Sequence, residues 1–216
     1  MAFGKTASCL ILAGAMWAQG AQFTVRHKHL NGGCAGEMTV DENGVRFTGA
    51  KKHVWSWKYE DIQQLTLSPE SIYILTYQDS KLRLGKDREY TFTGKVPAEE
   101  LYALLKDRMD QRFVAAVGQT TGLPTWSVPA KHLRPMVGSE GTLEFGADAI
   151  VYLSSARDES RTWRYSDIES MASSGPFQLT ITTLEKPFNF QLKQPITEAR
   201  YNQLWLQIEK KNGRIQ

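Results

Sequence analysis

The chain has 216 residues, of which 41% are hydrophobic and 23% are charged, and its formal net charge is +3. This composition is that of a globular protein and excludes a disordered or fibrous chain. The small net charge gives no reason to expect a nucleic-acid partner. The length suits two domains of about 100 residues each, and the many aromatic residues favour a β-rich core.

Residues 1–20 are predicted to be a signal peptide. Lys5 supplies a positive charge, and the apolar run at residues 7–18 is too short to cross a membrane. Small residues at the end of this run place cleavage after Gly20; the alternative is a buried N-terminal helix. We expect a periplasmic or secreted mature chain without a transmembrane segment. Cleavage would remove Cys9 and leave Cys34 as a buried thiol, a thiol paired between chains or a reactive thiol.

The first domain, residues 21–112, is predicted to form strands that end in one helix. Alternating apolar residues and turn signals, including Asn43-Gly44, delimit the strands. The expected strands are residues 23–30, 36–40, 45–48, 53–57, 62–67, 71–77, 81–84 and 89–93. Pro97 suits the first turn of the helix, and Leu101, Leu104, Leu105 and Met109 make its apolar face.

Residues 113–125 are predicted to be a linker, because they hold Gly118, Gly122 and Pro124. The start of this segment either continues the helix or begins a strand. The second domain, residues 126–216, shows the pattern of the first. Its expected strands are residues 141–145, 150–154, 161–165, 168–172, 177–183 and 187–192. Thr197 is the expected cap of a helix whose apolar face consists of Tyr201, Leu204, Trp205 and Ile208.

The two domains are related by an internal repeat. The sequence Trp-Lys-Tyr-Glu-Asp-Ile at residues 57–62 recurs as Trp-Arg-Tyr-Ser-Asp-Ile at residues 163–168. Lys-His-Leu at residues 28–30 recurs at residues 131–133, and Gly36 matches Gly141. Ordered matches of this kind indicate a duplicated domain. The shared residues of the main motif are Trp57, Tyr59, Asp61, Ile62, Trp163, Tyr165, Asp167 and Ile168.

This repeat unit resembles the pleckstrin-homology-like (PH-like) superfold. The resemblance rests on the short antiparallel strands, the final amphipathic helix and the Trp-x-Tyr-x-Asp-Ile motif. It is similar to bacterial PH and GRAM-type domains over residues 23–112 and 126–211. The His-x-His-Leu…Cys-x-Gly start also resembles uncharacterised exported bacterial proteins with one or two such domains. The resemblance implies two mainly β, α+β units, each an antiparallel sheet or barrel closed by a C-terminal helix. It implies no single function, because this superfold hosts lipid binders, peptide binders and scaffolds.

The best-known ligand of the PH-like superfold is a phosphoinositide headgroup, which basic residues bind in the loops between the first strands. Lys51 and Lys52 lie in such a loop, and with Lys28 they are the candidates for binding anionic lipid. The corresponding loop of the second domain, residues 157–159, has charges of both signs. We therefore rank a solvated loop ahead of a headgroup site.

Three histidines and the cysteine of the first domain are candidate metal ligands. His27 and His29 alternate on a strand and so point to one face, where Cys34 and His53 could complete a zinc or copper site. The second domain keeps only His132 at this place. We therefore rank structural or solvated histidines ahead of a metal site.

No sequence motif indicates an enzyme. The chain lacks the His-Glu-x-x-His, Gly-x-Ser-x-Gly, phosphate-loop and dinucleotide motifs. Cys34 with His29 or His53 is the one thiol–imidazole option, and Asp61 and Asp167 are expected to accept backbone N–H groups in turns. We expect a non-catalytic protein without a cofactor that binds an unknown protein or peptide through sheet edges or an inter-domain surface. The alternatives are metal binding and peripheral contact with anionic lipid.

Overall fold

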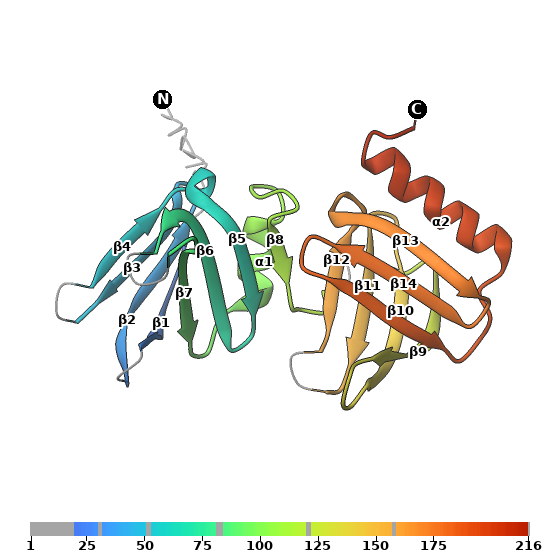
Figure 1. The fold of residues 1–216 in the computed structure, drawn as a ribbon, viewed down its shortest axis with the longest axis horizontal. Coiled ribbons are helices and arrows are strands. Elements are labelled where there is room, and N and C mark those ends of the chain that lie inside the picture. Colours follow the sequence, from blue (N-terminus) through green and yellow to red (C-terminus); the bar gives the residue numbers. More distant parts are fainter. Residues whose placement is uncertain are drawn as a thin grey trace, which may run out of the picture.

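The computed structural model describes residues 20–29, 32–50, 53–80, 84–119, 122–156 and 159–215. Two β-rich units lie side by side, with β8 and α1 between them (Figure 1). We call residues 21–112 the first repeat and residues 126–215 the second repeat. Nearly all of the predicted signal peptide, Lys51 with Lys52, and residues 81–83 of a predicted strand lie outside the described residues. Leu84, the last residue of that predicted strand, lies in a turn.

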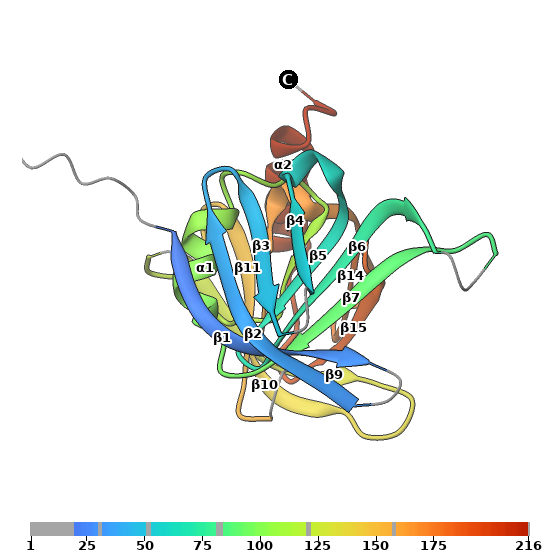
Figure 2. The ribbon, with the colours of Figure 1, turned by 90° about the vertical axis from the view of Figure 1, so that its left-hand side faces the viewer.

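The first repeat contains seven strands and one α-helix. Apolar residues alternate with polar ones along its strands, so each strand turns one face to the core. The elements are β1 (Ala21–His29), β2 (Gly32–Asp41), β3 (Gly44–Gly49), β4 (Val54–Trp57), the 3₁₀ turn η1 (Tyr59–Asp61), β5 (Ile62–Ser68), β6 (Ser71–Asp79), β7 (Asp87–Thr93) and α1 (Ala98–Leu105). Figure 2 shows this repeat facing the viewer.

The second repeat has the same series of elements. They are β9 (Trp126–Leu133), β10 (Ser139–Phe145), β11 (Ala149–Ser154), β12 (Arg161–Arg164), the 3₁₀ turn η2 (Tyr165–Asp167), β13 (Ile168–Gly175), β14 (Gln178–Thr183), β15 (Pro187–Leu192) and α2 (Glu198–Lys211). Thr197 caps α2 as predicted, because its side chain accepts a hydrogen bond from the backbone N–H of Arg200. Strand β9 was missing from the sequence prediction.

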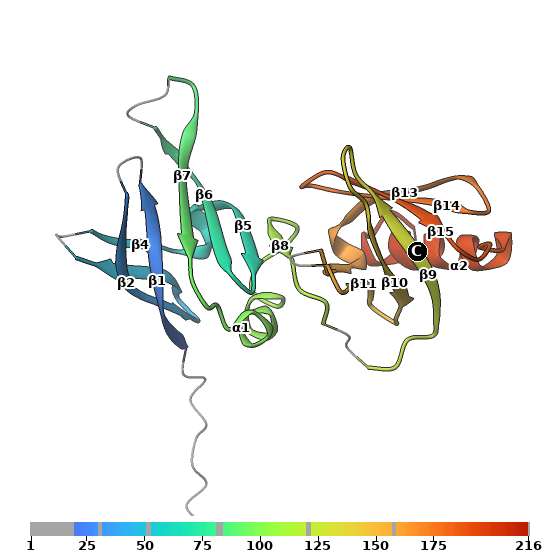
Figure 3. The same cartoon turned by 90° about the horizontal axis from the view of Figure 1, so that it is seen from below.

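The order of the strands is identical in the two repeats. It is β4-β3-β2-β1-β7-β6-β5 in the first and β12-β11-β10-β9-β15-β14-β13 in the second. Strand β8 (Phe113–Ala115) pairs in parallel with β5 and antiparallel with β12, and so joins both into one open sheet of 15 strands. This corrects the expectation of two separate sheets or barrels, because the start of the predicted linker is itself a strand. Figure 3 shows β8 between the two units from below.

The strand register shows which residues of the two repeats are equivalent. Trp57 pairs with Val45 as Trp163 pairs with Ile150, so the two tryptophans occupy equivalent strands, as predicted. The match of His29 with His132 was wrong by two residues. His27 lies opposite Phe92, and His132 lies opposite Phe190, so His27 is the true equivalent of His132.

Each repeat has its own hydrophobic core. Trp57 is 3% exposed and Trp163 is 4% exposed, and each ring packs edge-on against an aromatic ring of the seventh strand of its repeat. Two predictions for the helices need correction. Trp205 is 40% exposed and lies outside the core. Met109 is buried, but it follows the last residue of α1.

Candidate metal centre

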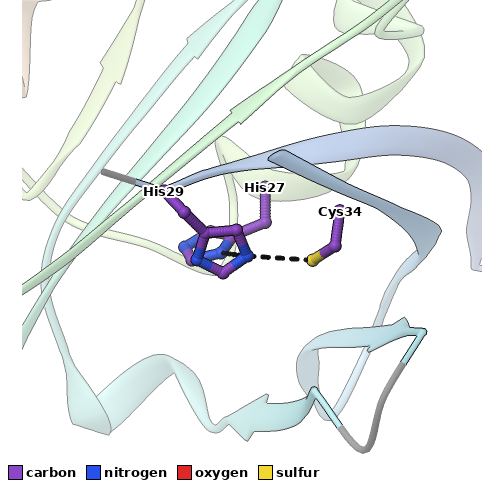
Figure 4. Close-up of side chains that lie close together, drawn as sticks. All are labelled: His27, His29 and Cys34. Carbon is purple, nitrogen blue, oxygen red and sulfur yellow. Dashed lines mark hydrogen bonds between the residues drawn. The ribbon is translucent and has the colours of Figure 1, made fainter. Parts of the chain in front are cut away.

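The hairpin of β1 and β2 brings the predicted metal-ligand residues together. His27 and His29 lie on the same face of β1, and Cys34 of β2 is directly opposite His27 in the register. His53 directly precedes β4, which pairs with β3 in the same sheet. In Figure 4 the rings of His27 and His29 and the sulfur of Cys34 point toward one another.

The distances between the ligand atoms are those of a metal-binding cluster. His27 Nδ1 is 3.3 Å from His29 Nε2, which is 3.2 Å from Cys34 Sγ. The same sulfur is 3.3 Å from His53 Nδ1. One possible ligand atom from each of His27, His29 and Cys34 lies within 4.8 Å of the others. Tetrahedral zinc would place neighbouring nitrogens about 3.3 Å apart and nitrogen and sulfur about 3.6 Å apart, as its bond lengths require.

Hydrogen bonds satisfy this arrangement only if His29 Nε2 shares one lone pair or proton between two partners. Each nitrogen of a neutral imidazole has either one proton or one lone pair in the ring plane. His29 Nε2 nevertheless has two close partners, His27 Nδ1 and Cys34 Sγ. A metal ion among these atoms would accept the lone pairs without such sharing, so the arrangement is compatible with coordination.

The surroundings keep His27 neutral and ready to coordinate. His27 is 8% exposed, and burial, with smaller electrostatic contributions from its neighbours His29, His53 and Arg88, lowers its pKa to about 4. The ring centroid of His27 is 4.7 Å from that of Trp55. The ring of His53 stacks on the same Trp55. These aromatic contacts fix the orientation of the imidazoles.

The second repeat places a different polar cluster at the same site. The register gives the equivalents of His27, His29, Cys34 and His53 as His132, Arg134, Ser139 and Glu159. Glu159 accepts hydrogen bonds from His132 Nδ1 at 3.3 Å and from Arg134 Nη1 at 2.5 Å. The carboxylate thus satisfies its neighbours without a metal ion. The first repeat has a metal-ligating residue type at all four positions.

The recurrent motif residues have structural roles. Tyr59 donates a hydrogen bond to the Asp41 carbonyl at 2.5 Å, and Tyr165 donates one to the Gly146 carbonyl at 2.6 Å. Each therefore fastens the turn after the second strand of its repeat. Asp61 accepts the backbone N–H of Lys58 at 3.3 Å, as predicted. Ile62 and Ile168 are fully buried in the two cores.

The candidate lipid site stays a prediction. Lys28 is exposed on the face of β1 opposite to His27 and His29, and its two predicted companions, Lys51 and Lys52, lie outside the described residues. Neither helix in the described part of the chain has the length and apolar character that a membrane crossing requires. The expected protein or peptide partner also stays a prediction.

Comparisons with solved structures give weak similarities. No protein-family model matches the sequence, and no curated protein matches it. The structure of the Spt16D Pob3N heterodimer is similar with 13% identity and a TM-score of 0.34, over 77% of this chain and 84% of that chain. The C-terminal domain of an unknown protein from Leishmania infantum is similar with 14% identity and a TM-score of 0.33, over 39% of this chain and 83% of that chain.

Proposed function

We propose that the first repeat is a non-catalytic metal-binding module. It holds one transition-metal ion through Cys34 and the imidazoles of His27, His29 and His53. The observation that carries this proposal is the convergence of one ligand atom each from His27, His29 and Cys34 within 4.8 Å, with His53 Nδ1 3.3 Å from the same sulfur. From the sequence we ranked structural histidines first, and this geometry is our reason for proposing the metal site instead.

The ligand types favour a metal of the zinc–copper class. Thiolate and imidazole suit zinc and copper, whereas magnesium and calcium prefer oxygen ligands. The four residues offer three nitrogens and one sulfur and no carboxylate, which supports a borderline or soft ion.

The second repeat supports the first without binding metal. Its four equivalent positions form the Glu159 network, and β8 joins its sheet to that of the first repeat. The shared strand order and the terminal helices agree with a tandem PH-like fold, which we propose as the finer description of the architecture. In this account the superfold supplies the scaffold, and the metal centre is built on the first hairpin of one copy.

Metal titration of the purified full-length chain tests the proposal. Zinc should bind with a stoichiometry of one, compete with a chromophoric chelator and raise the melting temperature by mass action. Cobalt should bind with a thiolate-to-metal charge-transfer absorption. Cys34→Ser should abolish that absorption. It should also weaken zinc binding by more than about 10–100-fold, which is the typical effect of mutating a residue that only contacts a metal ligand.

The matched control is Ser139→Ala, which changes the residue equivalent to Cys34 in the second repeat. This variant should bind zinc and cobalt like the unmodified chain. Failure of the unmodified chain to bind either ion, or binding that is unchanged in both Cys34→Ser and His29→Ala, would refute the proposed function.

A further inference from the structure

The sulfur of the candidate metal centre belongs to a partly exposed residue. Cys34 is partly exposed, and its neighbours in the sequence Gly32-Gly33-Cys34-Ala35-Gly36 have no side chain larger than a methyl group. No bulky side chain of this segment of β2 lies beside the thiol. The imidazoles of His29 and His53 contact the sulfur at 3.2 and 3.3 Å, and Cys34 also packs at the edge of the first core.

The same sulfur is the only one in the cluster. A bound metal ion requires Cys34 as the thiolate, which is the form that reacts with oxidants. Cys34 is also the one cysteine among the described residues, so no second cysteine of this part of the chain can trap it as a disulfide. Susceptibility to oxidation follows thiolate character and exposure, and a metal-bound, partly exposed Cys34 would combine both.

Resting on the proposed function, we infer that the metal centre is redox-gated: a peroxide oxidises Cys34, and the oxidised side chain releases the metal ion. The thiolate sulfur attacks one peroxide oxygen, an S–O bond forms and the O–O bond breaks. The sulfur loses two electrons to the peroxide, and hydroxide leaves. The product is a neutral sulfenic acid, so the ion keeps imidazole ligands alone.

The step is reversible with a thiol reductant. Two equivalents of a small thiol convert the sulfenic acid back to the thiol, with one disulfide of the reductant and one water as products. The regenerated thiol loses its proton when the ion binds again. The second repeat takes no part, because its equivalent residue is Ser139, whose hydroxyl peroxide does not oxidise, and Glu159 already satisfies its neighbours.

The test uses the zinc-loaded full-length chain and hydrogen peroxide. Released zinc is measured with a chromophoric chelator whose affinity is too low to remove zinc from the loaded chain. Sulfenic acid at Cys34 is measured by dimedone labelling with peptide mapping. We expect one zinc ion released for each Cys34 oxidised, and uptake of zinc again after treatment with dithiothreitol. Cys34→Ser, loaded at a higher zinc concentration, should release no additional zinc with peroxide.

The outcomes separate the two claims. A chain that holds no zinc before peroxide is added refutes the proposed function itself. A chain that holds zinc and retains it, whether Cys34 is oxidised or stays reduced, overturns the redox inference alone. Equal peroxide-induced release from Cys34→Ser would also overturn it, because the release would then come from another residue.

Discussion

His53 and Glu159 occupy the same position in the two repeats, two residues before the equivalent residues Trp55 and Arg161 of the fourth strand. His53 contacts the sulfur of Cys34, whereas Glu159 accepts hydrogen bonds from His132 and Arg134. The two repeats therefore place a polar cluster at the same location with different chemistry. It is a network around Glu159 in the second repeat and a group of candidate metal ligands in the first.

Transplanting the ligands into the second repeat should create a second metal site. The triple variant Arg134→His, Ser139→Cys and Glu159→His reproduces the side chains of the first repeat around His132. Because the backbone register is shared, we expect the zinc stoichiometry to rise from one to two, measured by equilibrium dialysis. The double variant that keeps Ser139 should bind the second ion more weakly. A stoichiometry of one in a folded triple variant would mean that the ligand positions are not equivalent.

The buried tryptophans should carry a large share of the stability. Trp57→Ala and Trp163→Ala each leave a cavity in a core, so each should lower the free energy of unfolding by about 3–5 kcal/mol. Urea denaturation followed by circular dichroism measures this loss. Trp205→Ala is the matched control on the exposed face of α2 and should change the free energy of unfolding by about 0.5 kcal/mol or less. Equal losses in the three variants would contradict the assignment of the cores.

Arg164 should couple the two repeats. Its guanidinium donates to the carbonyls of Lys106, Met109 at 3.1 Å and Asp110 at 3.0 Å, and it pairs with Asp167 at 2.7 Å. Arg164→Ala would leave the buried carboxylate of Asp167 without its ion-pair partner, so we expect a loss of about 3–5 kcal/mol, measured by urea denaturation.

The control for this prediction is Lys58→Ala, at the equivalent position of the first repeat. Lys58 is exposed and pairs only loosely with Glu60, so its loss should cost less than about 1 kcal/mol. The double variant of Arg164→Ala with Asp167→Asn should recover part of the stability, because it removes the unpaired charge. If Arg164→Ala and Lys58→Ala lowered the free energy of unfolding by similar amounts, the contacts of Arg164 with the first repeat would contribute nothing to stability.

Acidification should destabilise the second repeat through His132. Burial lowers the pKa of His132, and the hydrogen bond and charge of Glu159 offset only part of this effect. The unfolded chain therefore binds a proton at a higher pH than the folded chain does. Stability should be full above the ordinary histidine pKa of about 6.5 and should fall as the pH drops below it.

Urea denaturation at pH 7.5 and pH 5.5 measures this dependence. The variant His132→Asn should lose less stability between the two pH values than the unmodified chain does, since one proton-binding group is gone. An unchanged loss in His132→Asn would place the pH dependence elsewhere in the molecule.

The fold could be predicted from the sequence where the signal was local. The Trp-x-Tyr-x-Asp-Ile motif aligned Trp57 with Trp163 correctly, and alternating apolar residues located most strands. Strand β9 was missed because Pro129 lies within it, and proline is rare inside a central strand. The role of β8 depends on pairing with both β5 and β12, which no local pattern encodes.

The candidate site was predicted in part for the same reason. The alternation of His27 and His29 placed both rings on one face, which the structure shows. The position of Cys34 opposite His27 depends on the register of the hairpin. The sequence match of His29 with His132 was shifted by two residues, so it did not reveal that His27 is the equivalent of His132. The contacts of Arg164 with residues 106–110 join distant parts of the sequence, and its residue type alone gave no signal for them.

X-ray absorption at the zinc edge of the zinc-loaded chain tests the central claim most directly. The proposed centre predicts a first shell with one sulfur at about 2.3 Å and imidazole nitrogens at about 2.0–2.1 Å. The sulfur contribution should disappear in Cys34→Ser and persist in Ser139→Ala. A first shell composed only of nitrogen and oxygen atoms in the unmodified chain would contradict a metal centre built on Cys34.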